Sequence, residues 1–214
     1  DEPLGIEIKG EPKPIFPHPD DKNWNGLSLP WMAYGYGISL TPLQILTFYN
    51  SIANNGEMVK PKFLEKVVNS VENDHKFKKE IINSSICSKK TLKIINKMLY
   101  DVVHHPNGTA NNIKSKYFGI SGKTGTAQID YSTDSINYNS SFVGFFPSDK
   151  PKYSCIITIN KPNKKLGYYG STVAGPVFKN IAEKIMSKQP HYLKYTIEEI
   201  EKELINNKIV SANQ

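Results

Sequence analysis

Residues 119–128, which read GISGKTGTAQ, decide how the rest of the chain is interpreted. Lys123 supplies a positive charge, and Thr124 and Thr126 supply hydroxyl groups on either side of Gly125. Because side chains alternate along an extended strand, we expect the two threonines on one face and Lys123 and Gly125 on the other. A glycine inside a strand often marks the close approach of a ligand or of another backbone. The stretch predicts either a binding strand or an ordinary glycine-rich turn between strands, and the surrounding sequence must decide between them.

The composition is that of an ordinary folded domain with a basic surface. The 214 residues carry a net charge of +7, with 38% hydrophobic and 22% charged residues, which suits one large domain. The lysines are scattered, without an arginine-rich helix or zinc-ligand spacing, so we expect no nucleic-acid partner. The two cysteines form no metal-ligand pattern, and we predict no metal site and no cofactor. No apolar run reaches the roughly 20 residues of a membrane helix, and the opening residues read as the middle of a longer protein.

The N-terminal part is expected to hold an extended lead-in and a helix. Residues 1–30 contain too many prolines for a helix, which predicts a segment that runs over the surface. A helix is predicted over residues 41–56, with Thr41 as N-cap, Pro42 in the first turn and Gly56 as the stop. Apolar residues surround most of this helix, so we expect it to be buried.

The next segment predicts a strand, a hairpin tip and a second helix. Residues 58–71 predict a short strand, followed by a charged hairpin tip over 72–80. A helix capped by Ser88 is predicted over 88–104, and the charges of His104 and His105 would suit its negative C-terminal end. The inward side chains of the strand are expected to be Phe63, Val67 and Val68. The apolar stripe of the helix is expected to consist of Leu92, Ile95, Met98, Leu99, Val102 and Val103.

The C-terminal part predicts a small sheet and two helices. The strand of the opening stretch, residues 142–146 and residues 153–159 predict a three-stranded antiparallel meander, with the polar segment 130–140 as a loop. An amphipathic helix is predicted over 176–187, and a short, charged, peripheral helix over 196–206.

Five separated blocks of the sequence point to one family. The blocks are residues 29–44, 50–61, 108–110, 122–128 and 142–147. In their residues, order and spacing these blocks resemble the cell-division class B penicillin-binding proteins. The resemblance covers residues 1–187 and implies the C-terminal part of a peptidoglycan D,D-transpeptidase domain. The implied fold class is α/β (α+β), a partial penicillin-binding-protein/serine β-lactamase-like transpeptidase fold in which antiparallel strands pack with helices.

The resemblance also divides the chain into parts. Residues 1–187 are expected to form a partial transpeptidase domain, and residues 188–214 a peripheral C-terminal extension. Within the domain, the expected parts are the lead-in 1–30, a helical part 41–105, the Lys-Thr-Gly strand with its sheet 117–160, and the packing helix 176–187.

Site residues follow from the same resemblance. In the family, the Lys-Thr-Gly strand borders a catalytic cleft and binds the D-Ala-D-Ala end of a peptidoglycan stem peptide, or a β-lactam that mimics it. Lys123 would supply positive potential and take part in a proton relay, and Thr124 and Thr126 would hydrogen-bond the terminal carboxylate. The backbone N–H of Thr126 would donate to the acyl oxygen as half of an oxyanion hole. Gly125 would leave room for the substrate backbone.

The sequence departs from the family pattern at the nucleophile. The family's nucleophile is the serine of Ser-x-x-Lys, but no serine of this chain has a lysine three positions later. Residues 135–137 and 211–213 match the family's Ser-x-Asn motif, but both follow the Lys-Thr-Gly strand, whereas the family places that motif before it. We therefore expect the chain alone to be inactive. Its unpaired strand edges would be covered by the missing N-terminal half of the domain or by a neighbouring copy.

Two other functions compete with this interpretation. One is a non-catalytic module with a degenerate transpeptidase fold, which binds peptidoglycan or division-machinery proteins. The other is a β-lactamase, against which the helix block at residues 40–44 and the proline-rich lead-in both count. For the parent protein, the resemblance implies an extracytoplasmic location, with a membrane anchor supplied by an upstream helix.

Overall fold

The fold is built around a three-stranded antiparallel sheet, seen in a computed structural model that describes residues 2–68, 75–129 and 136–189. The strands are β5 (Ser121–Ile129), β6 (Asn137–Phe146) and β7 (Tyr153–Asn160), in the order β5-β6-β7. The predicted meander is confirmed. β6 begins earlier than predicted, because residues 137–140 pair with residues 126–129 of β5 instead of lying in a loop.

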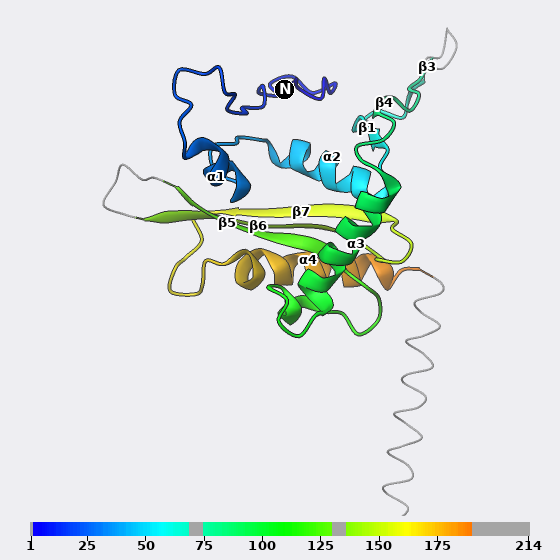
Figure 1. Ribbon diagram of the computed structural model, residues 1–214. Coiled ribbons are helices and arrows are strands. Elements are labelled where there is room, and N and C mark those ends of the chain that lie inside the picture. The colour runs from blue at the N-terminus through cyan, green and yellow to red at the C-terminus, as the bar shows by residue number, and fades with distance from the viewer. Residues whose placement is uncertain (1, 69–74, 130–135, 190–214) are drawn as a thin grey trace, which may run out of the picture.

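Helices cover both faces of this sheet (Figure 1). α2 (Pro42–Ala53) lies on one face against β6 and β7, and α4 (Gly170–Met186) lies on the other, while α3 (Lys89–His104) packs beside β5. The smaller elements are α1 (Ser28–Ala33), the 3-10 turn η1 (Asn111–Ile113), and the short strands β1 (Met58–Val59), β2 (Lys66–Val67), β3 (His75–Lys76) and β4 (Ile81–Asn83). Helices packed on antiparallel strands are the predicted architecture.

The main core lies between the sheet and α4. Phe142, Phe146 and Phe178 are fully buried there, and the ring of Phe178 meets the other two edge-on at centroid distances of 4.8 and 5.7 Å. On the opposite face, Phe145 of β6 belongs to a second cluster that joins α2 and α3 to the sheet. Successive phenylalanines of β6 thus anchor opposite layers, as the alternation of side chains along a strand requires.

The predicted capping of α2 is confirmed, and its predicted burial is confirmed in part. The hydroxyl of Thr41 accepts from the Gln44 N–H at 3.2 Å, and the Gln44 side chain accepts from the Thr41 N–H at 2.9 Å, a complete capping box. Phe48 is 47% exposed. The buried side chains of α2 are Gln44, Thr47, Ser51 and Ile52. Of its other residues, only Pro42 is also exposed and six are partly buried, so α2 is largely but not wholly covered.

The segment between α2 and α3 also differs from the prediction. Instead of one strand over 58–71, β1 pairs with β4 and β2 pairs with β3, each pair two or three residues long. Phe63, Val67 and Val68 are 51%, 50% and 65% exposed rather than inward-facing. β1 contacts α2, whereas β3 lies away from the central sheet (Figure 1). The antiparallel β2–β3 pair is what a hairpin requires, but β3 lies inside the range 72–80 that was predicted as the tip; residues 69–74 lie outside the described residues.

α3 matches its predicted bounds to within one residue. The Ser88 hydroxyl accepts from the Thr91 N–H at 3.1 Å, which confirms the predicted cap. Leu92, Leu99 and Val103 are buried as predicted, but Met98 is 62% exposed. The helix therefore contacts the body through a narrower stripe than the sequence pattern suggests.

α4 begins six residues before its predicted start at Pro176. A proline usually marks a first helical turn, but here Pro176 lies inside the helix. The start is set by the sheet instead, because the N–H of Gly170 finds a partner in the Thr126 hydroxyl at 3.0 Å. The predicted helix over 196–206 and most of the predicted extension lie outside the described residues.

Candidate functional site

The outer edge of β5 is the centre of the candidate site. Two bonds show which way its N–H groups point: that of Ile120, just before β5, donates to His104 Nε2 at 3.1 Å, and that of Gln128 donates to the Tyr36 hydroxyl at 3.5 Å. N–H groups two residues apart point to the same side of a strand. The N–H groups of Thr124 and Thr126, between these two positions, therefore point away from β6. Neither has a hydrogen-bond partner outside the sheet among the described residues.

Lys123 lies at this open edge. Its ammonium donates to the Thr124 carbonyl at 2.9 Å and approaches the Thr124 hydroxyl at 3.4 Å, while the side chain remains exposed. Partial desolvation by the surrounding chain lowers the pKa of the Lys123 ammonium. The cation is thus held at the same outer edge as the N–H group of Thr124.

The two threonines share the face of β5 that is turned toward α4. Thr124 pairs in register with Phe142, which packs on α4, and its hydroxyl lies 3.4 Å from that of Thr109. Thr126 pairs with Ser140, and its hydroxyl accepts the N–H of Gly170. Both hydroxyls thus lie on the face opposite Lys123: that of Thr124 is within 3.4 Å of the Lys123 ammonium at the edge, and that of Thr126 is turned toward Gly170 of α4.

Gly125 allows a close contact between β5 and β6. A Cβ atom at this position would lie 2.5 Å from the hydroxyl oxygen of Ser141, its partner in register. A side chain here would push against β6 on the face that carries Lys123. The structure thus brings together all four residues of the Lys-Thr-Gly-Thr stretch at one strand edge, and adds Thr109 from the turn after α3.

Three residues that contact this strand were not predicted from the sequence to belong to the site. Tyr36 comes from the segment after α1, His104 from the end of α3, and Gly170 from the start of α4. The prediction that His104 is a charged group at a helix end is wrong: burial and the nearby Lys114 ammonium lower its pKa, and its neutral Nε2 accepts the Ile120 N–H. Its ring also stacks on Tyr100, with centroids 4.0 Å apart. The signal in the sequence was that Tyr36 lies within residues 29–44, one of the blocks that resemble the family.

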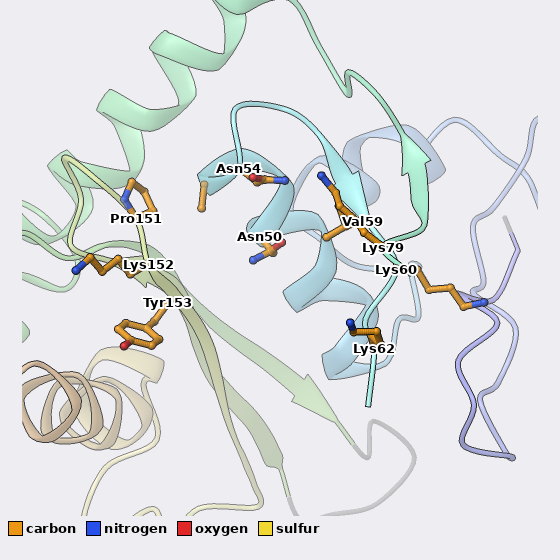
Figure 2. Close-up of a pocket in the computed structure, with 10 residues that line it drawn as sticks. Asn50, Asn54, Val59, Lys60, Lys62, Lys79, Pro151, Lys152 and Tyr153 are labelled. Atoms are coloured by element: carbon orange, nitrogen blue, oxygen red, sulfur yellow. The ribbon is translucent and has the colours of Figure 1, made fainter. Parts of the chain in front are cut away.

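A prominent cavity lies away from the β5 edge. It measures about 440 Å³ and lies between α2, β1 and the start of β7, and Figure 2 shows the residues that line it. Three of its four lysines are engaged by other groups, since Lys60 pairs with Glu80 at 3.2 Å, Lys79 pairs with Glu57, and Lys62 donates to the Phe77 carbonyl at 3.3 Å. The cavity therefore does not form a ready-made anion site.

The described part of the chain holds neither a metal-ligand cluster nor a membrane-spanning helix. Within it, no group of three His, Cys, Asp or Glu side chains is placed to hold a metal ion. None of its helices is long and apolar enough to span a lipid bilayer. The Ser-x-Asn matches at 135–137 and 211–213 lie wholly or partly outside the described residues.

Known proteins with similar sequences belong to one class of cell-wall enzymes. A family model described as the penicillin binding protein transpeptidase domain matches residues 3–183. The chain is 35% identical over 167 residues to the peptidoglycan D,D-transpeptidase FtsI of Buchnera aphidicola subsp. Baizongia pistaciae, and 31% identical over 152 residues to the stage V sporulation protein D of Bacillus subtilis. These matches cover 77% and 70% of this chain but only 28% and 23% of those proteins.

Solved structures share the fold. Penicillin binding protein 3 from Mycobacterium tuberculosis matches with a TM-score of 0.76 at 27% identity, over 87% of this chain and 43% of that one. The same protein has been solved in complex with aztreonam and with ampicillin. A peptidoglycan glycosyltransferase from Burkholderia ambifaria matches with a TM-score of 0.66 at 26% identity, over 86% of this chain and 51% of that one. These matches confirm the predicted fold, of which the chain spans only part.

Proposed function

The chain belongs to the penicillin-binding protein transpeptidase domain family, and from that membership we propose that it is the substrate-binding part of a serine-type D,D-transpeptidase of peptidoglycan synthesis and cell division. Its ligand would be the D-Ala-D-Ala end of a stem peptide, and β-lactams would compete for the same place. The parent protein would act on the outer side of the cell membrane, held there by an anchor outside this chain, with division-machinery proteins as partners.

The open edge of β5 is the observation that carries this proposal. The Thr124 and Thr126 N–H groups point outward without a partner among the described residues, and the Lys123 ammonium lies at the same outer edge as that of Thr124. An extended peptide can add to such an edge as a further strand, with its backbone bonded to these N–H groups. A peptide that ends in a carboxylate would also gain from the nearby positive charge.

Each residue of the edge then has a role. Lys123 attracts the terminal carboxylate and supports proton transfer, and the hydroxyls of Thr124 and Thr126 bind the carboxylate oxygens. The Thr126 N–H donates to the oxygen that becomes negative during acyl transfer, where preorganised donors stabilise the transition state most strongly. Gly125 keeps β5 close to β6, so that this edge stays straight enough to bind an extended ligand.

The nucleophile would come from residues outside this chain. No serine here has a lysine three positions later, so the reacting serine of the family pattern has no counterpart in the sequence. We propose that this chain binds the substrate while a second part of the transpeptidase domain, packed against it, supplies Ser-x-x-Lys and Ser-x-Asn. The chain alone would then be unable to form an acyl-enzyme.

The missing nucleophile also supports the second candidate, a non-catalytic module that binds peptidoglycan or division proteins. One experiment separates the two. The full-length gene product is incubated with a fluorescent penicillin and examined on a denaturing gel. The transpeptidase proposal predicts a covalent band, whereas a protein that folds but is never labelled would support the module instead.

A matched pair of lysine variants tests the role of the β5 edge in the same assay. Lys123→Ala should slow labelling by about 100-fold or more, as is typical when a preorganised electrostatic contact is lost. Lys90→Ala, which removes an exposed lysine from the first turn of α3, should label like the wild type. Normal labelling of Lys123→Ala would refute the proposed role of this edge.

A further inference from the structure

The N-terminus of α4 lies against β5 and β6 more closely than any side chain would allow. A Cβ atom at Gly170 would lie 2.3 Å from the Ser141 carbonyl oxygen and 2.5 Å from the Gly125 carbonyl oxygen. Both atoms are backbone, so they cannot move aside as a flexible side chain can. Glycine is thus required for the first residue of α4 to sit beside the Lys-Thr-Gly strand.

Two hydroxyl groups from neighbouring strands hold this helix start. Thr126 of β5 and Ser140 of β6 are directly opposite in register. The Ser140 hydroxyl donates to the Tyr168 carbonyl, and the Thr126 hydroxyl accepts from the Gly170 N–H at 3.0 Å. The N-cap residue Tyr169 makes no side-chain cap of its own. The sheet therefore supplies the cap that α4 lacks.

The bond from Gly170 determines how the Thr126 hydroxyl can bind a ligand. A threonine hydroxyl has one hydrogen to donate and two lone pairs that can accept. Here the Gly170 N–H occupies a lone pair, and the positive end of the α4 dipole lies on the same side. A hydroxyl that accepts from a donor also becomes a better donor itself. Among the described residues nothing accepts its hydrogen, which leaves that hydrogen for a ligand acceptor at the β5 edge.

We infer that Gly170 is a positioning residue, which holds the Thr126 hydroxyl as a dedicated donor for an anionic ligand group. This inference rests on the proposed function, in which that group is a terminal carboxylate. Gly170 acts through Thr126 and does not touch the ligand. As a consequence, the site would discriminate between a carboxylate and the same group masked as a neutral ester, and part of this discrimination would depend on Gly170.

The test uses the full-length protein and one penicillin in two forms, the free acid and its methyl ester. The rate constant of acylation is measured for both, and the acid-to-ester ratio is compared between variants. Gly170→Ala should lower this ratio roughly tenfold or more, the effect expected for one hydrogen bond to a charged group. Thr126→Val, which keeps the shape but removes the hydroxyl, should lower it similarly. Thr126→Ser, which keeps the hydroxyl, should preserve the ratio.

The outcomes are distinct. If Gly170→Ala or Thr126→Val slows acylation by the acid and by the ester equally, the role of Gly170 is merely structural and the inference is overturned. If Gly170→Ala does not fold, Thr126→Val still decides the matter. Gly26→Ala is the matched control, because a Cβ there meets nothing within 4 Å, and its ratio should equal that of the wild type. A wild-type protein that neither form acylates would instead refute the proposed function itself.

Discussion

The imidazole of His104, at the end of α3, accepts a hydrogen bond from the backbone N–H of Ile120 at 3.1 Å. This bond ties α3 to the residue directly before β5, three positions from Lys123. At the other end of the open edge, the Tyr36 hydroxyl accepts the N–H of Gln128. The outer edge of β5 is thus hydrogen-bonded at both ends, by His104 and by Tyr36, and the candidate site lies between these two bonds.

The His104 bond should depend on pH. Burial and the Lys114 ammonium lower the pKa of His104, so the folded state favours the neutral ring that can accept from Ile120. The stability gained is fully present above the ordinary histidine pKa of about 6.5 and is lost as the pH falls through the lowered pKa. The hydrogen-exchange protection factor of the Ile120 amide should therefore fall about fivefold on acidification, since a net hydrogen bond contributes about 1 kcal/mol.

A matched variant identifies the titrating group in this measurement. His105→Gln changes the exposed neighbour of His104 and should leave the pH dependence as it is. If protection at Ile120 does not change with pH, the neutral His104 acceptor is not what holds the start of β5.

The core between the sheet and α4 should depend strongly on Phe178. This side chain is fully buried against Phe142 and Phe146. Phe178→Ala should lower the free energy of unfolding by about 3–5 kcal/mol, because it removes apolar contacts and leaves a cavity. Val177→Ala, at a position that is 41% exposed on the same helix, should cost only about 0.5 kcal/mol. Urea unfolding measures both, and equal costs would contradict the packing described here.

Close packing of β5 on β6 should make Gly144 intolerant of a side chain. A Cβ atom there would lie 2.3 Å from the Ser121 carbonyl oxygen and 3.0 Å from the Gly122 Cα. We expect Gly144→Ala to lower the free energy of unfolding by about 1–3 kcal/mol, measured by urea unfolding. Gly26→Ala again provides the control and should change it by about 0.5 kcal/mol or less. A neutral Gly144→Ala would mean that the two strands are further apart than described.

The isolated chain should not react with penicillin. Without a Ser-x-x-Lys serine, it lacks the nucleophile that the transpeptidase proposal assigns to the rest of the domain. Intact-mass spectrometry after incubation with a penicillin should find no covalent adduct on this chain, while the full-length protein gains one. A far-ultraviolet circular dichroism spectrum with helix and strand serves as the folding control. An adduct on the folded isolated chain would contradict the proposed division of roles.

Local features of the fold were predictable because they depend on neighbouring residues. Thr41 and Ser88 cap α2 and α3 as predicted, and the three strands pair as a meander. The family resemblance, which rests on ordered blocks of sequence, is confirmed by the match over residues 3–183. It remains a prediction that the Lys-Thr-Gly residues bind substrate.

Features that depend on distant parts of the chain were not predictable. Tyr36 meets Gln128 across 92 positions, and Gly170 meets Thr126 across 44, so no local pattern indicates either contact. Pro176 suggested a helix start, yet α4 begins where the sheet caps it, at Gly170. Exposure of Phe63 and Phe48 likewise depends on which layers surround them, and hydrophobicity alone does not specify those layers.

The central claim is that the outer edge of β5 binds the substrate, and a structure of the full-length protein acylated by a penicillin tests it most directly. We predict that the acyl carbonyl oxygen lies within hydrogen-bond distance of the Thr126 N–H, at about 2.7–3.1 Å. The carboxylate should contact the hydroxyls of Thr124 and Thr126, and the acylated serine should belong to a part of the protein outside this chain. An acyl group bound elsewhere, with the β5 edge empty, would contradict the account.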